Sequence, residues 1–419
     1  MKTRFLTNKH ASLLIAISLI SAYAFVCMTK NCFSAAMVFI VNEGYMTKLE
    51  TGIISGCFYI VYAIMQIFGG VAVDRWHPER FITFGMLGAA LANIGVYFCY
   101  ENYALTLAIW VLNALAQFCV WPATFKLIST FLATEHRYRA LTIVTLSNPM
   151  GVTAGYIVAA LVGKWQHNFL VSGIGLIVLA LIWEIAFRSV KKNISEEEIH
   201  EPTYDSFSHR ARTHISFFRL SLTSGLILIL IVAFCRTSIE QTKSLIPTMI
   251  KESYAEVSPI FATALNIIVL VCAALGPLLG NTLRKIFKSE FVAMTTLLTC
   301  AFPFALVPLW VGKINYWIIV ASISVVILLA SAAGFFTTTY IAVSFAQWGK
   351  DGTVAGLLNA LSSLGFVAVL FGLTAIAEFG NWTITWLFVV LLLVIAMVLS
   401  SVETPIWNHF KEDSKTQTQ

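Results

Sequence analysis

The sequence predicts an all-α membrane protein with twelve transmembrane helices in two six-helix bundles. Its 419 residues are 58% hydrophobic and only 11% charged, whereas soluble domains are about 25% charged. The apolar residues gather in runs of the length, about 20 residues, that a helix needs to cross a hydrocarbon core about 30 Å thick. A long polar stretch near the middle of the chain leaves six runs on each side.

The twelve runs follow one another with turn signals between them. The first six lie near residues 11–40, 51–73, 80–100, 104–131, 140–163 and 168–189. The second six lie near residues 219–249, 257–281, 290–312, 316–346, 353–378 and 382–402. The segment Lys9–Ile20 resembles a signal peptide by itself, but eleven further spans follow it, so we expect it to stay as the first helix.

The basic residues predict the orientation in the membrane. Of the 27 Lys and Arg residues, 19 lie on the side of the amino terminus, 4 lie on the opposite side and 4 lie within spans. Because cytoplasmic loops are enriched in Lys and Arg, both termini are expected in the cytoplasm and the protein in the plasma membrane. The formal charge of +6 follows this topology and indicates no nucleic-acid partner. The expected parts are a bundle over 1–189, a cytoplasmic linker over 190–218, a bundle over 219–404 and a cytoplasmic tail over 405–419.

Three charged residues interrupt the seventh run, Leu228–Ile250. Arg236, Glu240 and Lys243 are spaced by four and three residues, so a helix brings them to one face. A charge at the bilayer centre costs about 2.5 to 3.5 kcal/mol on the insertion scale, so this face should look onto a wet cavity or onto partners. Pairing of Glu240 with the two cations, as a purely structural feature, is the alternative.

Lys30 and Lys126 add two more cations within spans. Four cations therefore accompany one nearby acid, Glu240, which predicts a net positive cavity and a small anionic substrate. Guanidinium binds phosphate or carboxylate through a planar fork, and ammonium adds a compact charge. Because no histidine lies in a span, Glu240 is the best candidate for proton coupling.

The remaining motifs argue against other classes of protein. The eight cysteines have no paired spacing and the eight histidines are scattered, so no metal, disulfide framework or cofactor is expected. A nucleotide-binding Gly-x-x-x-x-Gly-Lys-Ser/Thr loop is absent from the sequence. The chain is therefore not expected to be an enzyme, and a gradient should supply its energy. We expect a monomer.

Residues 69–80 read Gly-Gly-Val-Ala-Val-Asp-Arg-Trp-His-Pro-Glu-Arg, directly after the second span. This segment resembles the loop signature of the major facilitator superfamily, whose fold is two six-helix bundles. The resemblance implies a gating role for Gly70, Asp74, Arg75 and Arg80. We expect Asp74 to stabilise the outward-facing state by meeting the eleventh helix near residues 352–353. The second-half counterpart, 276–285, lacks the acid.

Further motifs resemble the organophosphate:phosphate antiporter family within that superfamily. They are Thr29-Lys30-Asn31-Cys32-Phe33, Trp121-Pro122 with Lys126, Asn148 with Gly151, Gly356 with Gly365, and Arg236 at the position of the substrate arginine. The resemblance implies antiport of phosphate esters, with Arg236, Lys30, Lys126, Thr29 and Lys243 binding the substrate.

Two positions depart from the family pattern. Thr29 stands where the family has a second substrate arginine, and Thr130 stands where it has a histidine. These changes weaken the prediction of phosphate recognition. A proton-coupled carrier of a non-phosphorylated carboxylate or sugar acid, and a membrane sensor on the same fold, therefore stay open as alternatives.

Overall fold

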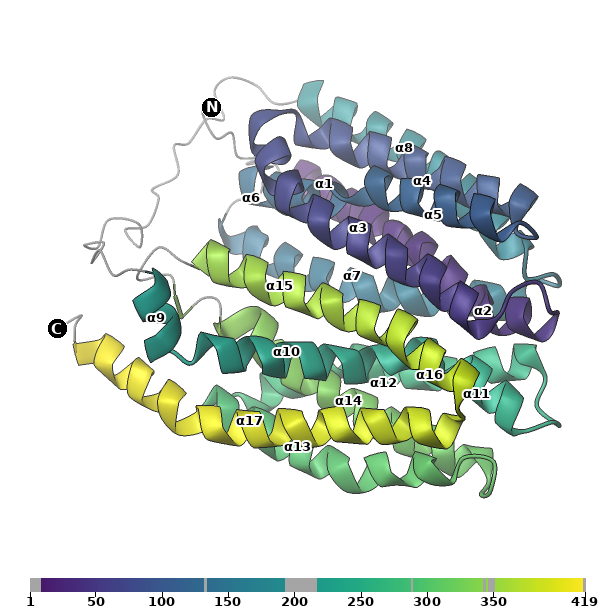
Figure 1. Ribbon diagram of the computed structural model, residues 1–419. Coiled ribbons are helices and arrows are strands. Elements are labelled where there is room, and N and C mark those ends of the chain that lie inside the picture. Colours follow the sequence, from purple (N-terminus) through teal and green to yellow (C-terminus); the bar gives the residue numbers. More distant parts are fainter. Residues whose placement is uncertain are drawn as a thin grey trace. The chain divides into compact units, whose positions relative to one another are not determined.

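The computed structural model describes residues 9–131, 134–192, 217–287, 289–341, 344–345 and 351–416, and its regular structure there is entirely helical (Figure 1). The chain folds into two compact units. The first comprises Met1–Thr203 with Pro259–Ala264, and the second comprises Tyr204–Ser258 with Leu265–Gln419. The predicted linker, 190–218, falls largely outside the described residues.

The first unit contains eight helices within the described residues. They are α1 (Lys9–Lys30), α2 (Cys32–Asn42), α3 (Lys48–Arg75), α4 (Pro78–Cys99), α5 (Tyr103–Gln117), α6 (Val120–Phe131), α7 (Thr134–Leu161) and α8 (His167–Lys192). Helix α1 packs against α7 and α8, and α4 packs against α5 and α8. Local sequence signals begin several of these helices: Thr47 and Glu50 form a capping box for α3, and Pro78 opens α4.

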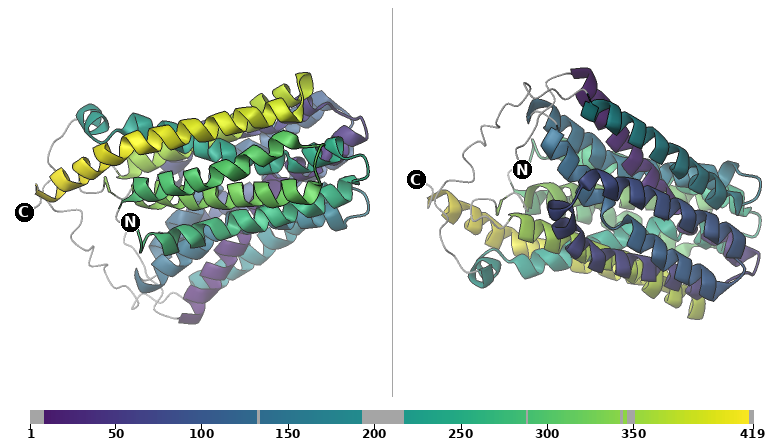
Figure 2. Two further views of the ribbon diagram at one scale, coloured as in Figure 1. Left: turned by 90° about the horizontal axis from the view of Figure 1, so that it is seen from below. Right: turned by 90° about the horizontal axis from the view of Figure 1, so that it is seen from above.

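Nine α-helices within the described residues belong wholly or largely to the second unit. They are α9 (Phe217–Thr223), α10 (Leu226–Gln241), α11 (Ile246–Ser253), α12 (Pro259–Leu283), α13 (Glu290–Leu306), α14 (Tyr316–Phe335), α15 (Asp351–Val367), α16 (Thr374–Phe379) and α17 (Trp382–Thr416). Helix α10 packs against α14, α15 and α17, and α13 packs against α14 and α17. Figure 2 shows the long α17 from two further sides.

The prediction of an all-helical membrane protein is confirmed. Within the described ranges, ten helical stretches are long and apolar enough to cross a membrane. Each of the twelve predicted runs lies on one or more helices. Ten of the runs match these stretches, and the other two are the fifth run, on α7, and the seventh run, which includes α10. Helix α7 begins with a polar, charged segment, and α10 is only 16 residues long and carries Arg236 and Glu240.

Two helix breaks lie next to the predicted charged residues. Asn31 separates α1 from α2 directly after Lys30, and its amide Nδ2 donates to the Cys27 carbonyl at 2.7 Å. A 3₁₀ turn, Thr242–Ser244, separates α10 from α11 and contains Lys243. Discontinuous helices expose backbone groups that only protein or water can satisfy within a membrane, so such breaks mark polar regions.

Gly151 permits close packing of α7 on α1. A Cβ atom at this position would lie 2.9 Å from the Cys27 Cβ and 3.0 Å from the backbone nitrogen of Met28. Small residues let membrane helices approach closely, because helix association there rests on packing rather than on hydrophobic exclusion. The resemblance-based motif at Gly151 therefore has a packing role in this unit.

We predict that Gly151→Ala lowers the apparent melting temperature of the purified protein. Forced overpacking costs about 1 to 3 kcal/mol, and here the obstacle includes α1 backbone, which yields little. Gly163→Ala is the matched control, because a Cβ there meets nothing within 4 Å. Equal melting temperatures for the two variants would contradict this close α1–α7 contact.

Candidate functional site

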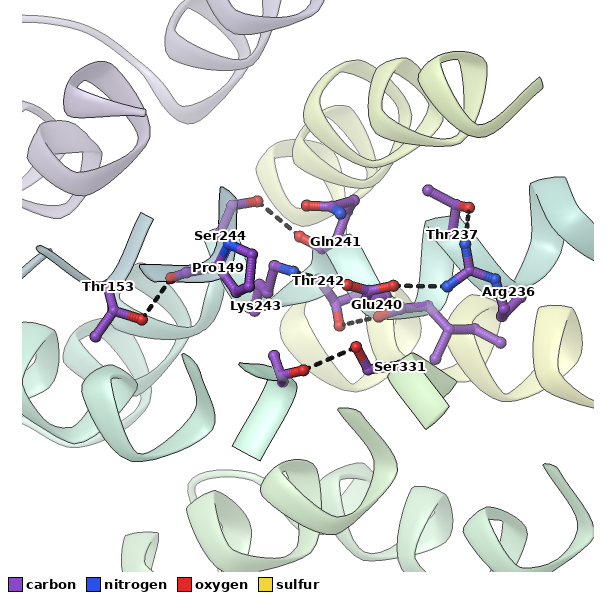
Figure 3. A network of polar contacts seen from close by, with 12 residues as sticks. Pro149, Thr153, Arg236, Thr237, Glu240, Gln241, Thr242, Lys243, Ser244 and Ser331 are labelled. Atoms are coloured by element: carbon purple, nitrogen blue, oxygen red, sulfur yellow. Dashed lines mark hydrogen bonds and ion pairs between the residues drawn. The ribbon is translucent and has the colours of Figure 1, made fainter. Parts of the chain in front are cut away.

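The three charged residues of the seventh run form one buried ion cluster (Figure 3). The Arg236 Nη1 atom lies 2.6 Å from Glu240 Oε2, and the Lys243 Nζ atom lies 3.1 Å from Glu240 Oε1. Both cations point toward the same carboxylate, which accepts one hydrogen bond on each oxygen. The predicted spacing on one face of the helix therefore produces direct contact within this unit.

This cluster is largely removed from solvent by the protein itself. The side chains of Arg236, Glu240 and Lys243 are 5%, 17% and 12% exposed. The Arg236 Nη2 atom donates to the Thr237 hydroxyl at 2.7 Å, while its Nε is buried without a hydrogen-bond partner among the described residues. An unsatisfied buried donor is costly, so this guanidinium keeps the capacity for one more acceptor.

Gly334 of α14 makes room for the Arg236 guanidinium. A Cβ atom on Gly334 would lie 2.8 Å from the Arg236 Cζ, so a larger residue would push the guanidinium away. Gly365 of α15 likewise lies close to α10, where a Cβ would sit 3.1 Å from the Ser238 nitrogen. The backbones of α14 and α15 therefore hold α10 tightly around the cluster. Two cations share one carboxylate, which leaves the cluster with a net positive charge.

Lys30 in the first unit is a buried cation with a different kind of surrounding. It is 7% exposed, and its Nζ lies 5.9 Å and 5.4 Å from the ring centroids of Tyr23 and Tyr62. The Cys27 thiol, three residues earlier on the same helix, is a further neutral neighbour. Within the described residues no carboxylate oxygen lies within 4.0 Å of Lys30, so aromatic faces and neutral groups surround its charge.

Hydroxyl groups of tyrosines extend this polar region of the first unit. The Tyr59 hydroxyl donates to Asn31 Oδ1 at 3.4 Å. The Tyr156 hydroxyl of α7 is buried without a hydrogen-bond partner among the described residues. The sequence reasoning missed these tyrosines. The spacing of Tyr59 and Tyr62, three residues apart on α3, was a signal that both share a helix face.

The other predicted binding residues have more local roles. The Thr29 hydroxyl is fully buried and donates to the Val26 carbonyl at 3.0 Å, within its own helix. Lys126 is half-buried on α6 and has an interaction partner. Trp121 on the same helix packs its ring 4.7 Å from that of Tyr23, which links α6 to the surroundings of Lys30.

The predicted gating residues are only partly described. Arg80 is exposed on the first turn of α4. Asp74 and Arg75 lie in the last turn of α3. The structure does not describe the side chains of these two residues, nor the surroundings of Gly70 and of residues 352–353. Their gating role stays a prediction.

Comparisons with known proteins bear on the family. The family model described as Major Facilitator Superfamily matches residues 19–370. The fold is similar to that of a bacterial homologue of the human lysosomal transporter Spinster, with a TM-score of 0.77, 15% identity, and coverage of 96% of this chain and 99% of that one.

Two curated relatives show weaker likeness over shorter stretches. The membrane sensor protein UhpC of Escherichia coli is 25% identical over 42% of this chain and 40% of its own length. A probable hexose phosphate transport protein of Chlamydia trachomatis is 23% identical over 50% of this chain and 49% of its own length. The matches thus span half or less of these relatives. The family model, by contrast, covers most of this chain, and the chain belongs to the Major Facilitator Superfamily.

Proposed function

We propose that this protein is a secondary transporter that moves a small organic anion, preferably a phosphate ester, by alternating access. The observation that carries this proposal is the excess of buried cations: Arg236 and Lys243 share one carboxylate, and Lys30 has none within 4.0 Å in the described part of its unit. A buried charge needs compensation, and a bound anion supplies it.

Phosphate esters fit the chemistry of this site. A guanidinium donates two parallel hydrogen bonds to phosphate, and the free Nε of Arg236 offers a further donor. The match to a probable hexose phosphate transport protein supports the same substrate class. Exchange for inorganic phosphate and coupling to protons are the two modes of energy supply that we propose.

Glu240 acts, in this proposal, as an internal anion that the substrate displaces. In this proposal its two carboxylate oxygens accept hydrogen bonds from Arg236 and Lys243 when no substrate is bound. Substrate must then compete with Glu240, or a proton must neutralise Glu240 and free both cations. This gives Glu240 a direct way to couple protons to anion binding.

A membrane sensor is the second candidate function. The match to the membrane sensor protein UhpC favours it. Thr29 also favours it, because a threonine stands where the resembled family has a second substrate arginine, and its hydroxyl donates to the backbone. A sensor would bind the anion without moving it. Counterflow of labelled sugar phosphates, glycerol phosphates and simple carboxylates in proteoliposomes separates transport from sensing and identifies the substrate class.

We predict that Arg236→Lys weakens substrate binding by about 1.5 to 3 kcal/mol, or roughly ten- to hundredfold in Kd, because the charge stays and the planar fork is lost. Lys30→Gln should weaken binding as well. Binding is measured on purified, folded protein.

Arg284→Lys is the matched control for this series. Arg284 is an exposed arginine of the same unit, stacked 4.0 Å from the Tyr340 ring centroid. Its exchange should leave affinity unchanged. Unchanged affinity in Arg236→Lys would remove Arg236 from the site and leave ion pairing as its only role.

We predict that Glu240→Gln lowers the melting temperature of the ligand-free protein and increases the stabilisation by inorganic phosphate. Removing one partner of a buried ion pair costs about 3 to 5 kcal/mol, since Arg236 and Lys243 then lose their carboxylate. An added anion should restore that loss by mass action. Uptake by this variant should no longer respond to a proton gradient.

Glu290→Gln serves as the control for loss of a paired acid. Glu290 lies 2.7 Å from Lys411 in the same unit, away from the α10 cluster. Its exchange should lower the melting temperature without raising the response to phosphate. The internal-anion role would be refuted if phosphate stabilised Glu240→Gln no more than the unchanged protein.

We predict that both termini and residues 190–218 lie in the cytoplasm of a plasma-membrane protein, because 19 basic residues lie on that side and 4 on the other. Reporter enzymes active on one side of the membrane, fused at each position, measure this. An extracytoplasmic linker reporter would invert the proposed topology.

A further inference from the structure

A second buried carboxyl lies in the same unit as the α10 cluster but outside that cluster. Glu403 of α17 has an exposed fraction of 0%. Neither of its oxygens has a hydrogen-bond partner among the described residues, and none of their ion pairs includes it. The anion site described above makes no use of this group.

Glu403 packs against the junction of α9 and α10. Gly225 at this junction has φ +65°, the left-handed conformation that glycine adopts without strain. A Cβ atom on Gly225 would lie 2.5 Å from the Glu403 carboxyl carbon. The carboxyl therefore lies against bare backbone, at the point where α10 begins. The adjacent Ser224 hydroxyl is also buried without a partner among the described residues.

No described neighbour neutralises a negative charge at this position. Helix α17 packs against α10, α13, α16 and the 3₁₀ turn Val307–Trp310. Titratable residues lie on these elements, on α9 and on the nearby turns of α17. They are Arg219, Cys235, Arg236, Glu240, Glu290, Cys300, Glu378, His409, Lys411 and Glu412. None of them forms a hydrogen bond or ion pair with Glu403, and Glu290 and Lys411 are paired with each other.

The start of α10 does not replace the missing partner either. A helix amino terminus carries partial positive charge and favours a nearby carboxylate. That effect depends on N–H groups that point at the anion, and no backbone N–H donates to either Glu403 oxygen. An ionised carboxylate here would lose its hydration and gain no hydrogen bond, whereas a neutral acid loses much less.

We infer that Glu403 is a proton-binding site, separate from the anion site, and that its carboxyl carries a proton while α17 packs on the α9–α10 junction. Loss of the proton creates a charge that needs water or a cation, which requires α17 and the junction to separate. Proton binding and this packing are therefore linked, because a ligand favours the state that binds it better. The inference concerns protonation alone and does not depend on the substrate class.

Infrared spectroscopy of the full chain in lipid tests the protonation directly. At neutral pH we expect an infrared band from the carbonyl stretch of a protonated carboxylic acid. In Glu403→Gln this band should lose the intensity that one carboxylic acid contributes. The amide of glutamine imitates the neutral acid, so this variant should fold and keep its melting temperature. Glu378→Gln, an acid near the end of a predicted span, is the control and should keep the band. Absence of the band, or its persistence in Glu403→Gln, would overturn the proposal.

A glycine series tests the contact between Glu403 and the junction. Gly225→Ala combines left-handed strain with overlap of the carboxyl, whereas Gly44→Ala carries similar strain at φ +77° with nothing within 4 Å. We expect the larger fall in melting temperature for Gly225→Ala, and part of it should be recovered by adding Glu403→Ala. Equal falls for the two glycine variants would refute the contact.

The ligand of Glu403 is identified by changing the cations in solution. Replacing sodium with choline should leave both the infrared band and the melting temperature unchanged. A band that appears only when sodium is withdrawn would mean that the carboxylate binds sodium, and the proton site would be wrong.

Discussion

The structure depends on one electrostatic constraint: charged side chains in a low-dielectric interior need compensation close by. Glu240 meets that need for Arg236 and Lys243, at 2.6 Å and 3.1 Å, on a helix that lipid-exposed surroundings would not tolerate. The neighbouring helices adapt to this cluster. Gly334 leaves room for the guanidinium, and Gly365 lets α15 approach α10. The backbones of α14 and α15 thus approach α10 closely beside these charges.

The first unit compensates its buried cation in another way. Lys30 lies over the rings of Tyr23 and Tyr62 and beside a thiol, without a carboxylate in contact among the described residues. Aromatic faces attract a cation but do not cancel its charge. The two units therefore differ in how much positive charge they leave available.

A break in regular helix lies next to each of the three buried charged or titratable sites. The chain leaves regular helix at Asn31 and at Thr242–Ser244, each next to a buried cation, and again at Gly225 next to Glu403. At each break, backbone and side-chain groups become available for other partners. The three sites differ in their counter-charge: neutral aromatic groups at Lys30, a shared carboxylate at Arg236, and at Glu403 the proton that we infer.

The sequence by itself determined the fold class, because apolar runs of membrane-spanning length depend only on composition and order. It also determined that Arg236 and Glu240 share one helix face, because they are four residues apart; Lys243 reaches the same carboxylate from the 3₁₀ turn that follows. Only the tertiary structure decided that Tyr62 of α3 lies beside Lys30, whereas Tyr23 and Cys27 share helix α1 with it. It alone revealed Glu403 as buried: that residue follows the predicted span 382–402, and it packs against Gly225 at the start of α10. Side-chain periodicity fixes neighbours along a helix, whereas contacts between helices depend on how their surfaces fit.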